Sequence, residues 1–475
     1  MSEICKLEPQ AVWKYFDLIC SVPHPSGHES ALAAKLCDAA REAGLTARCD
    51  AAGNVRIDRP AAPGFEQLPT VILQGHLDMV PASDHEFDFL TTPVTPRIDG
   101  PWVTACGTTL GADTGLGVAH AMAILCDKEL KCGALAGLFT VSEETGLVGA
   151  AALSGDFLAG KYLLNCDNGD RRSFSIGCAG GARQIITFAP AWTTAKGTGV
   201  KLTLSGLKGG HSGTCIHLER GNAIKFLAEF LDLYPEISIA SITSGTVDNA
   251  IPAEAEACGA SELPPAKLQQ FADAFVMAAK ADLPNAADMQ IAVTATETPD
   301  KVWEADFRAR ITAALSLVPD GAFEMSETFD AVRDSSNLAI VRCSENQVEI
   351  RTSQRSLVDT ERDRVCAMIA NHFATFGGTV TTGNIYPAST PKPQSHLLDL
   401  ASAVRKRMNA PVELQVIHAG LESGWFALKN PDLEIISCGP YMEFCHTPKE
   451  RLEIESVAEF DRFIRLLLAD IAGEQ

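Results

Sequence analysis

Residues 70–78 read TVILQGHLD, an apolar run that leads directly into a histidine and an aspartate. An unbroken apolar run is typical of a strand in a sheet that is covered on both faces. The pattern recurs in residues 134–144 and 162–167, which also end in acidic side chains. In open α/β sheets ligands bind beyond the carboxyl ends of the strands. We therefore expect the chemistry of this chain to collect at one edge of a sheet.

The bulk properties exclude several classes of protein. With 475 residues, the chain exceeds the size at which single cores usually stop growing, so we expect two or three folded units. No apolar run approaches the roughly eighteen residues that span a bilayer. The net charge of −21 repels polyanions such as nucleic acids and anionic lipid surfaces. The sequence therefore predicts neither a nucleic-acid partner nor a membrane partner.

The first residues of the chain and its cysteines indicate where in the cell the protein is located. Glu3, Lys6 and Glu8 stand where a secretory signal would carry a basic stretch and then an apolar one. The 15 cysteines form no Cys-x-x-Cys pattern, and most are expected to be reduced and buried. We therefore predict a cytoplasmic location.

Two breaks divide the chain into parts. One is the glycine-rich stretch Gly177–Gly181, and the other is the proline-rich stretch Tyr386–Pro393. If His446 completes the site begun by the first strands, the middle part is an insertion into a discontinuous domain. The predicted fold is an α/β domain of residues 1–181 and 387–475, with a central, mostly parallel sheet flanked by helices and an inserted α+β domain at 182–386.

His76 and Asp78 lie two residues apart at a predicted strand end, where both side chains can point to one side. A metal-bound imidazole commonly donates its other N–H to a carboxylate, so Asp78 can orient His76. A purely structural His-x-Asp pair is the alternative.

Further candidates are four carboxylates and a second histidine. Asp113 lies in a glycine-rich loop and could instead cap a helix. Glu143 and Glu144 end an apolar strand, where a metal ion on one and a proton on the other would explain two desolvated carboxylates. Asp167 and His446 also follow apolar runs, with caps or turns as the alternative. Oxygen and imidazole ligands without thiolate suit hydrolytic zinc, manganese or cobalt.

Six ordered motifs resemble those of the aminoacyl-histidine dipeptidases, which belong to the two-zinc aminoacylase and carboxypeptidase superfamily. The motifs are Gln74–Val80, Leu110–Gly115, Glu143–Gly146, Leu207–Gly213, His418–Gly424 and His446–Pro448. The similarity covers essentially the whole chain. It implies a zinc-peptidase catalytic domain whose inserted domain is a lid.

The resemblance also implies a cofactor and its ligands. The expected cofactor is two Zn2+ ions per subunit, with Mn2+ or Co2+ as substitutes. The implied ligands are His76 and Asp167 for one ion, Glu144 and His446 for the other, and Asp113 for both. Asp78 would support His76, and Glu143 would be the general base.

Four further residues are expected to contact the substrate, His211 as a catalytic residue and the other three as binding residues. In the family pattern His211 donates to the developing oxyanion and Asn249 binds polar groups. A strand at about 347–356 offers Arg351 and Arg355 on one face, and Arg355 is preferred for the substrate carboxylate because its surroundings resemble the family pattern. Glu422 could bind a free amino terminus. The structural alternatives are a capped turn for Asn249, solvated charges for Arg355 and Glu422, and a packed or surface histidine for His211.

The expected activity is metal-dependent hydrolysis of small dipeptides, of the Xaa-His type or broader. An N-acyl amino acid deacylase or a carboxypeptidase of the same superfamily is the nearest alternative, and it would need no recognition of a free amine. A catalytically inactive scaffold would lack a ligand or the base, and none is missing. Ser423 stands where the family has cysteine, which leaves the preferred dipeptide open. The sequence also leaves open whether the chain forms a homodimer.

Overall fold

The computed structural model describes residues 2–473, which divide into two compact units. Unit 1 comprises the chain up to Cys178, Ser389–Val416 and the chain from Leu421 onward, and unit 2 comprises Ala179–Ala388 and Ile417–Gly420. The boundary between the units, at Cys178 and Ala179, lies inside the glycine-rich stretch Gly177–Gly181, and strand β9 begins at Gly180. A short segment after Val416 also returns to unit 2, which the sequence did not indicate.

Unit 1 is built on an eight-stranded sheet. In spatial order its strands are β1 (Thr46–Cys49), β2 (Val55–Arg59), β6 (Leu135–Thr140), β3 (Val71–His76), β7 (Tyr162–Asn165), β23 (Glu434–Ser437), β8 (Ser173–Cys178) and β22 (Glu413–Ile417). The central strands β6, β3, β7 and β23 pair in parallel. The pairs β1–β2, β2–β6 and β23–β8 are antiparallel. The parallel centre is the part that the apolar runs predicted.

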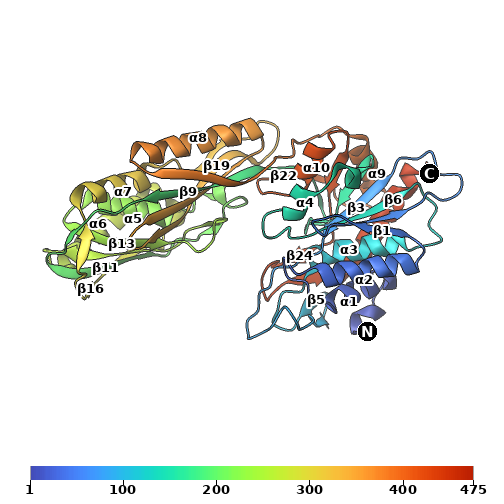
Figure 1. The fold of residues 1–475 in the computed structure, drawn as a ribbon, viewed down its shortest axis with the longest axis horizontal. Coiled ribbons are helices and arrows are strands. Elements are labelled where there is room, and N and C mark those ends of the chain that lie inside the picture. Colours follow the sequence, from blue (N-terminus) through green and yellow to red (C-terminus); the bar gives the residue numbers. More distant parts are fainter. Residues whose placement is uncertain (1, 474–475) are drawn as a thin grey trace. The chain divides into compact units, whose positions relative to one another are not determined.

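Helices cover both faces of this sheet, as Figure 1 shows. Helices α4 and α10 contribute Ala150 and Phe426 to a buried cluster with Ile72, Leu138 and Leu163 on one face. Helix α3 lies on the other face, and α1 packs on α3. The helices of unit 1 are α1 (Gln10–Cys20), α2 (Ser30–Glu42), α3 (Ala112–Leu125), α4 (Val148–Ala152), α9 (His396–Arg407), α10 (Ser423–Lys429) and α11 (Ile454–Ile471), with 3-10 turns at Glu3–Lys6 and Gly155–Leu158.

A second, four-stranded sheet completes unit 1. Its order is β24 (Met442–Glu443), β25 (Arg451–Glu453), β5 (Trp102–Ala105) and β4 (Pro96–Asp99). The neighbouring strands pair antiparallel. The loop between β24 and β25 carries His446, so this small sheet brings the end of the chain to residues near its start.

Unit 2 is built on a nine-stranded sheet of antiparallel strand pairs. Its order is β16 (Gln290–Thr296), β11 (Thr198–Ser205), β15 (Ala255–Ser261), β13 (Ile237–Ser244), β19 (Val332–Cys343), β20 (Val348–Ser356), β9 (Gly180–Phe188) and β21 (Thr379–Tyr386), with β18 (Gly321–Met325) also paired to β19. Two short ladders join β10 (Trp192–Thr194) to β17 (Lys301–Trp303) and β12 (Gly210–His211) to β14 (Ala250–Ile251). This mixture of helices and antiparallel strands agrees with the expected α+β insertion.

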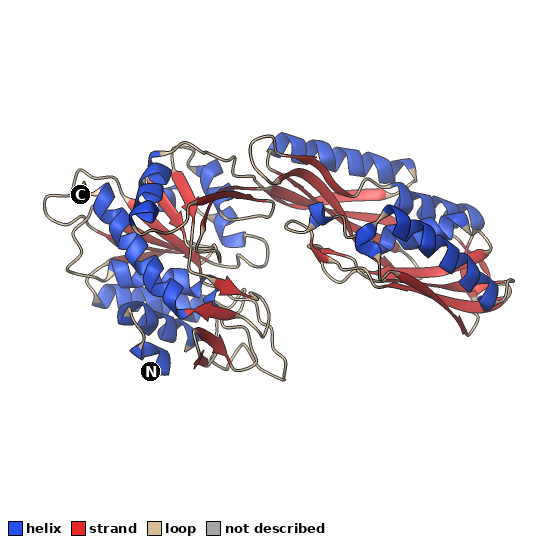
Figure 2. Cartoon of the chain, turned by 180° about the vertical axis from the view of Figure 1, so that it is seen from behind, coloured by secondary structure: helices blue, strands red, loops and turns tan. Residues whose placement is uncertain are grey.

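Helices lie against one face of the unit 2 sheet, as seen in Figure 2. They are α5 (Ala223–Leu233), α6 (Pro265–Asp282), α7 (Ala305–Leu317) and α8 (Asp359–Thr375), with 3-10 turns at Ile216–Leu218 and Pro284–Ala286. Val348 and Ile350 of β20 belong to the core under these helices. Because side chains alternate along a strand, Arg351 and Arg355 point to the opposite face.

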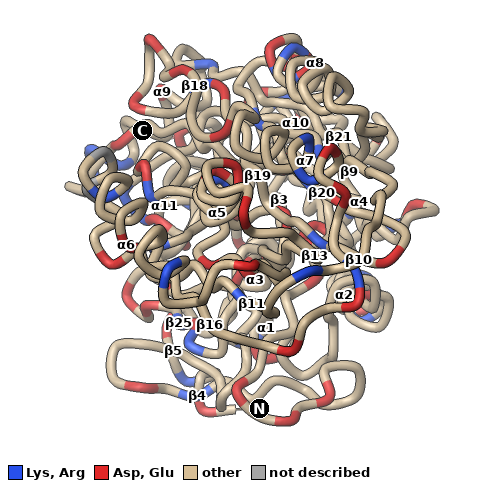
Figure 3. Tube along the Cα trace, turned by 90° about the vertical axis from the view of Figure 1, so that its left-hand side faces the viewer, with Lys and Arg blue, Asp and Glu red and all other residues tan. Residues whose placement is uncertain are grey.

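The charged residues are spread along the chain rather than gathered in one segment. No helix in the described part of the chain is long and apolar enough to cross a bilayer. Figure 3 shows acidic and basic residues scattered along the trace, and the chain carries a net charge of −21 at pH 7.

The contact between α3 and the end of β7 gives a test of the packing. A Cβ at Gly117 would lie 2.5 Å from Cys166 Cβ and 2.9 Å from its carbonyl oxygen. We expect Gly117→Ala to lower stability by about 1–3 kcal/mol through overpacking, more than the helix gains from alanine. The control is Gly155→Ala, because a Cβ there meets nothing within 4 Å. Equal urea midpoints for the two variants would contradict this packing.

Candidate active site

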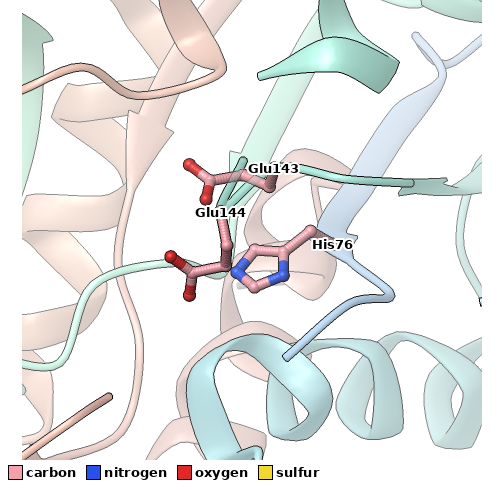
Figure 4. Close-up of side chains that lie close together, drawn as sticks. All are labelled: His76, Glu143 and Glu144. Atoms are coloured by element: carbon pink, nitrogen blue, oxygen red, sulfur yellow. The ribbon is translucent and has the colours of Figure 1, made fainter. Parts of the chain in front are cut away.

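Polar side chains meet at the carboxyl ends of three neighbouring strands. His76 ends β3, Glu143 and Glu144 follow β6, and Asp167 follows β7. Strand β3 lies between β6 and β7, so the three ends adjoin. Figure 4 shows His76 beside Glu143 and Glu144, which extend from one turn. The expected collection of polar groups at one sheet edge is confirmed.

Asp113 links the two histidines of this site. Its Oδ1 lies 3.3 Å from His76 Nε2, and its Oδ2 lies 3.1 Å from His446 Nε2. The same nitrogen of His446 is 2.7 Å from Glu144 Oε1. One carboxylate therefore faces a different histidine with each of its two oxygens, which is the geometry of a bridging ligand.

The possible ligand atoms form two overlapping groups. Each group has its ligand atoms within 4.8 Å of one another: His76, Asp113 and Asp167 in one, and Asp113, Glu144 and His446 in the other. A third such group joins His76 to Glu143 and Glu144. The donors are carboxylate oxygens and imidazole nitrogens, which suit zinc, manganese or cobalt in a hydrolytic site. The residues present therefore fit two adjacent divalent ions that share Asp113.

The close packing of these ionisable groups shifts their pKa values. Burial raises the pKa of Asp167 well above its usual range, and the charge of Asp113 adds to the effect. Burial likewise raises the pKa of Glu143, and the charges of Asp167 and Glu144 add to it. The His446 side chain is 47% exposed, so burial opposes its charge only in part, and hydrogen bonds to Asp113 and Glu144 raise its pKa to about 11. The metal-free site therefore binds protons that bound cations would displace.

Asp78 positions both His76 and the turn that carries the glutamates. Its Oδ1 accepts from the Glu143 backbone N–H at 2.9 Å, and its Oδ2 accepts from Glu144 N–H at 3.2 Å and Ser26 Oγ at 2.8 Å. Its carboxylate lies 3.4 Å from His76 Nδ1, and its backbone carbonyl is nearer, at 2.9 Å. Burial opposes ionisation of Asp78, but hydrogen bonding to His76 and to the Glu143 backbone lowers its pKa to about 2.

Sequence reasoning missed Glu450, which fixes the loop of Asp113. Its carboxylate is 2% exposed. It accepts hydrogen bonds from the backbone N–H groups of Leu110 at 2.7 Å, Gly111 at 3.1 Å and Ala112 at 2.9 Å. Burial raises its pKa to about 7. The only sequence signal was its closeness to the motif at His446, because a lone glutamate between charged residues resembles surface.

Glu29 was missed for a similar reason, since it stands directly before helix α2 and resembles an ordinary charged residue at a helix start. Its Oε1 accepts from the Ser142 backbone N–H at 2.9 Å and from Ser142 Oγ at 3.1 Å. Ser142 has a positive φ of 51°, an uncommon conformation outside glycine. Glu29 therefore holds the sharp turn that precedes Glu143.

Glu422 is not the exposed loop carboxylate that the sequence left as an alternative. It is 0% exposed, and its Oε2 accepts from Gln74 Nε2 at 2.6 Å and Thr140 Oγ1 at 2.8 Å. Its Oε1 has no hydrogen-bond partner within the part of the chain that the structure describes. Burial raises the pKa of Glu422 to about 7. The carboxylate thus lies beneath the ends of β3 and β6.

The remaining predicted residues, His211, Asn249 and Arg355, belong to unit 2. His211 pairs with Ala250 in the β12–β14 ladder, and Ser212 donates its backbone N–H to the Asn249 carbonyl at 2.8 Å. The ladder therefore sets His211 beside the Asn249 turn. His211 and Asn249 therefore lie close together within unit 2. Their separation in the sequence gave no indication of this contact.

Arg355 and Arg351 differ in their partners. Arg351 donates to Glu349 Oε1 at 2.8 Å and lies 4.0 Å from Asp248. Arg355 is 6% exposed and donates from Nη1 to the Tyr386 hydroxyl at 2.8 Å. No carboxylate of the described residues forms an ion pair with Arg355, and its Nε has no hydrogen-bond partner among them. A buried cation in this state favours an anionic ligand.

Comparison with known proteins gives a family match over most of the chain. The model of peptidase family M20/M25/M40 matches residues 72–470. The cytosol non-specific dipeptidase of Escherichia coli (strain K12) is 36% identical over 485 aligned residues, which cover 100% of both chains.

Solved structures agree with this match. The aminoacylhistidine dipeptidase from Vibrio alginolyticus superimposes with a TM-score of 0.85 at 36% identity, covering 99% of this chain and 98% of that one. The aminopeptidase PepT from Bacillus cereus has a TM-score of 0.58 at 16% identity, covering 98% of this chain and 99% of its own. At that identity the second likeness concerns the fold alone.

The raised pKa values of the site predict that metal binding displaces protons. In the metal-free protein, hydrogen bonds to carboxylates raise the pKa of His76 and of His446, although burial opposes both shifts. At pH 6 both imidazoles are then protonated, whereas a metal ligand must be neutral. We expect zinc to release about two protons or more, measured by calorimetry in two buffers of different ionisation enthalpy. His446→Ala should release fewer, and equal heats in both buffers would contradict the site.

Proposed function

This chain belongs to peptidase family M20/M25/M40, and we propose that it hydrolyses dipeptides at a pair of zinc ions held by unit 1. The observation that carries the proposal is Asp113, whose two oxygens face His76 and His446. Dipeptides are the proposed substrate class because two full-length relatives at 36% identity are named as dipeptidases. One of those names is non-specific and the other specifies aminoacylhistidine, so the proposed range is Xaa-His dipeptides or broader.

The proposed ligands follow from the two overlapping groups of donor atoms. His76 and Asp167 would hold one ion, Glu144 and His446 the other, and Asp113 both. Bound there, two divalent ions supply Lewis-acid activation of the attacking water and of the scissile carbonyl. Mn2+ or Co2+ offers the same chemistry with these ligands.

Glu143 is the proposed general base. Its carboxylate lies at the same strand ends as the ligands, and its backbone is held by Asp78 at 2.9 Å. Glu143 would take the proton of the attacking water onto a carboxylate oxygen and then deliver it to the nitrogen of the leaving amine.

Unit 2 supplies the proposed contacts to the rest of the substrate. His211 would donate to the oxyanion that develops at the scissile carbonyl, where a hydrogen bond is stronger in the transition state. Asn249 would bind polar groups, and Arg355 would bind the carboxylate terminus through charge-assisted hydrogen bonds. The proposal requires that unit 2, of the same chain or of a partner subunit, reaches substrate bound at unit 1 during turnover.

Glu422 is the proposed acceptor for the free amino group of the dipeptide. Its Oε1 lacks a hydrogen-bond partner among the described residues, and an ammonium group would supply one. Because the side chain has no exposed surface, the amine reaches it only when neighbouring side chains move aside. We also propose a cytoplasmic location, supported by the name of the Escherichia coli relative.

Metal removal and two substitutions test the proposed mechanism. Chelation should abolish dipeptide hydrolysis, and about two equivalents of zinc should restore it. Glu143→Ala should lower turnover by roughly 10² to 10⁴ while it keeps the metal, since only the proton transfer is lost. Asp113→Ala should instead lose metal, measured as zinc per chain. Full activity in the metal-free protein, or normal metal and turnover in both variants, would contradict the mechanism.

The role of Glu422 separates a dipeptidase from a deacylase. The wild-type enzyme should prefer a dipeptide over its N-acetyl form, because only the dipeptide carries an ammonium group. Glu422→Gln should reduce kcat/KM for the dipeptide about tenfold or more and change the N-acetyl substrate much less, since a charge-assisted hydrogen bond is lost. Equal losses for both substrates would show that Glu422 only supports the strand ends.

A further inference from the structure

Arg355, Gly181 and Tyr386 stand in line across three adjacent strands of unit 2. Arg355 of β20 pairs with Gly181 of β9, and Gly181 pairs with Tyr386 of β21. Residues opposite one another on neighbouring strands share a face of the sheet. Arg355 and Tyr386 are thus separated by one strand, and the residue between them has no side chain.

The missing side chain at position 181 is what allows the two residues to meet. A Cβ on Gly181 would lie 2.2 Å from the Tyr386 hydroxyl oxygen and 2.3 Å from Cζ. A Cβ on Gly420 would lie 2.6 Å from Cε2 of the same ring. Since real Cβ atoms do not approach so closely, the ring of Tyr386 occupies the space that two glycines leave open.

The backbone of Tyr386 is fixed as well as its ring. Arg362 of α8 donates from Nη1 to the Tyr386 carbonyl at 2.9 Å and to Asp359 at 2.6 Å. Asp359 also accepts from the Ala388 backbone N–H at 2.9 Å. The start of α8 therefore anchors the end of β21, and the hydroxyl of Tyr386 is held at a defined position over Gly181.

The hydrogen bond between Arg355 and Tyr386 leaves the hydroxyl proton of Tyr386 available as a donor. Arg355 donates from Nη1 to the Tyr386 hydroxyl oxygen at 2.8 Å. A guanidinium group only donates, so the hydroxyl accepts this bond and keeps its own proton for another acceptor. Both the tyrosine O–H and the remaining N–H groups of Arg355 can then reach a single anion.

The neighbours of Arg355 within residues 2–473 do not supply that anion. Ser335 pairs with Arg355 across β19 and β20, and its hydroxyl lies 2.7 Å from His418 Nε2. Burial, followed by the charge of Arg355, lowers the pKa of His418 to about 3, so this imidazole is neutral. A neutral histidine and a serine hydroxyl leave the guanidinium charge uncompensated.

We propose that Tyr386 completes the carboxylate-binding group of the enzyme together with Arg355. Its hydroxyl holds the guanidinium in place and donates its own proton to the terminal carboxylate of the dipeptide. This inference rests on the proposed function, in which Arg355 binds that carboxylate. It adds a second donor, so the pair selects a free carboxylate over a neutral amide or ester.

The test is Tyr386→Phe in the zinc-loaded, full-length enzyme, because phenylalanine keeps the ring over both glycines and removes only the hydroxyl. We expect KM for a dipeptide to rise about tenfold, with kcat within about twofold, because a charge-assisted hydrogen bond is lost. KM for the corresponding dipeptide amide should stay unchanged. The melting temperature should also stay unchanged. Tyr234→Phe, which removes another hydroxyl of unit 2, should match the wild type on both substrates.

Arg355→Ala separates the failure of this inference from the failure of the proposed function. If Arg355→Ala leaves KM for both substrates at the wild-type value, the proposed carboxylate contact itself is wrong. If Arg355→Ala weakens only the dipeptide while Tyr386→Phe equals the wild type, the role of Tyr386 is overturned. Equal losses on dipeptide and amide in Tyr386→Phe would also overturn it, because they would indicate a structural role alone.

Discussion

The repulsion among carboxylates at the ends of β3, β6 and β7 is the constraint on which unit 1 depends. Asp113, Glu143, Glu144 and Asp167 gather there around His76, and burial removes the water that would screen them. Such a cluster is stable only with protons or cations to balance it. The same crowding that makes the metal-free site bind protons suits it to divalent ions.

A second set of carboxylates holds this cluster in place through the backbone. Glu450 binds the N–H groups of the loop before Asp113, and Asp78 binds those of Glu143 and Glu144. Each of these acceptors satisfies backbone donors that would otherwise be buried without a partner. The candidate ligands are therefore positioned by backbone hydrogen bonds to groups that are not themselves proposed as metal ligands.

Unit 2 arranges its polar side chains on one face of an antiparallel sheet. Its helices cover one face, so the other face is free to carry polar side chains such as Arg355. A strand ladder fixes the spacing of those side chains far more closely than a loop does, and Gly181 lets Tyr386 reach Arg355 across one strand. The polar face thus carries hydrogen-bond donors at a spacing that the strand ladder fixes.

The sequence by itself determined the parallel core, the inserted unit and most candidate ligands, because apolar runs and the polar residues that end them are local patterns. His76, Glu143, Glu144 and Asp167 were found in this way. The family resemblance already assigned Asp113 and His446 to one site. Only the tertiary structure decided which oxygen of Asp113 faces each histidine, that Glu450 and Glu422 are buried, and that Gly180 and Gly181 begin a strand. These facts depend on which side chains meet across strands, and burial by distant neighbours leaves no periodic signal in the sequence.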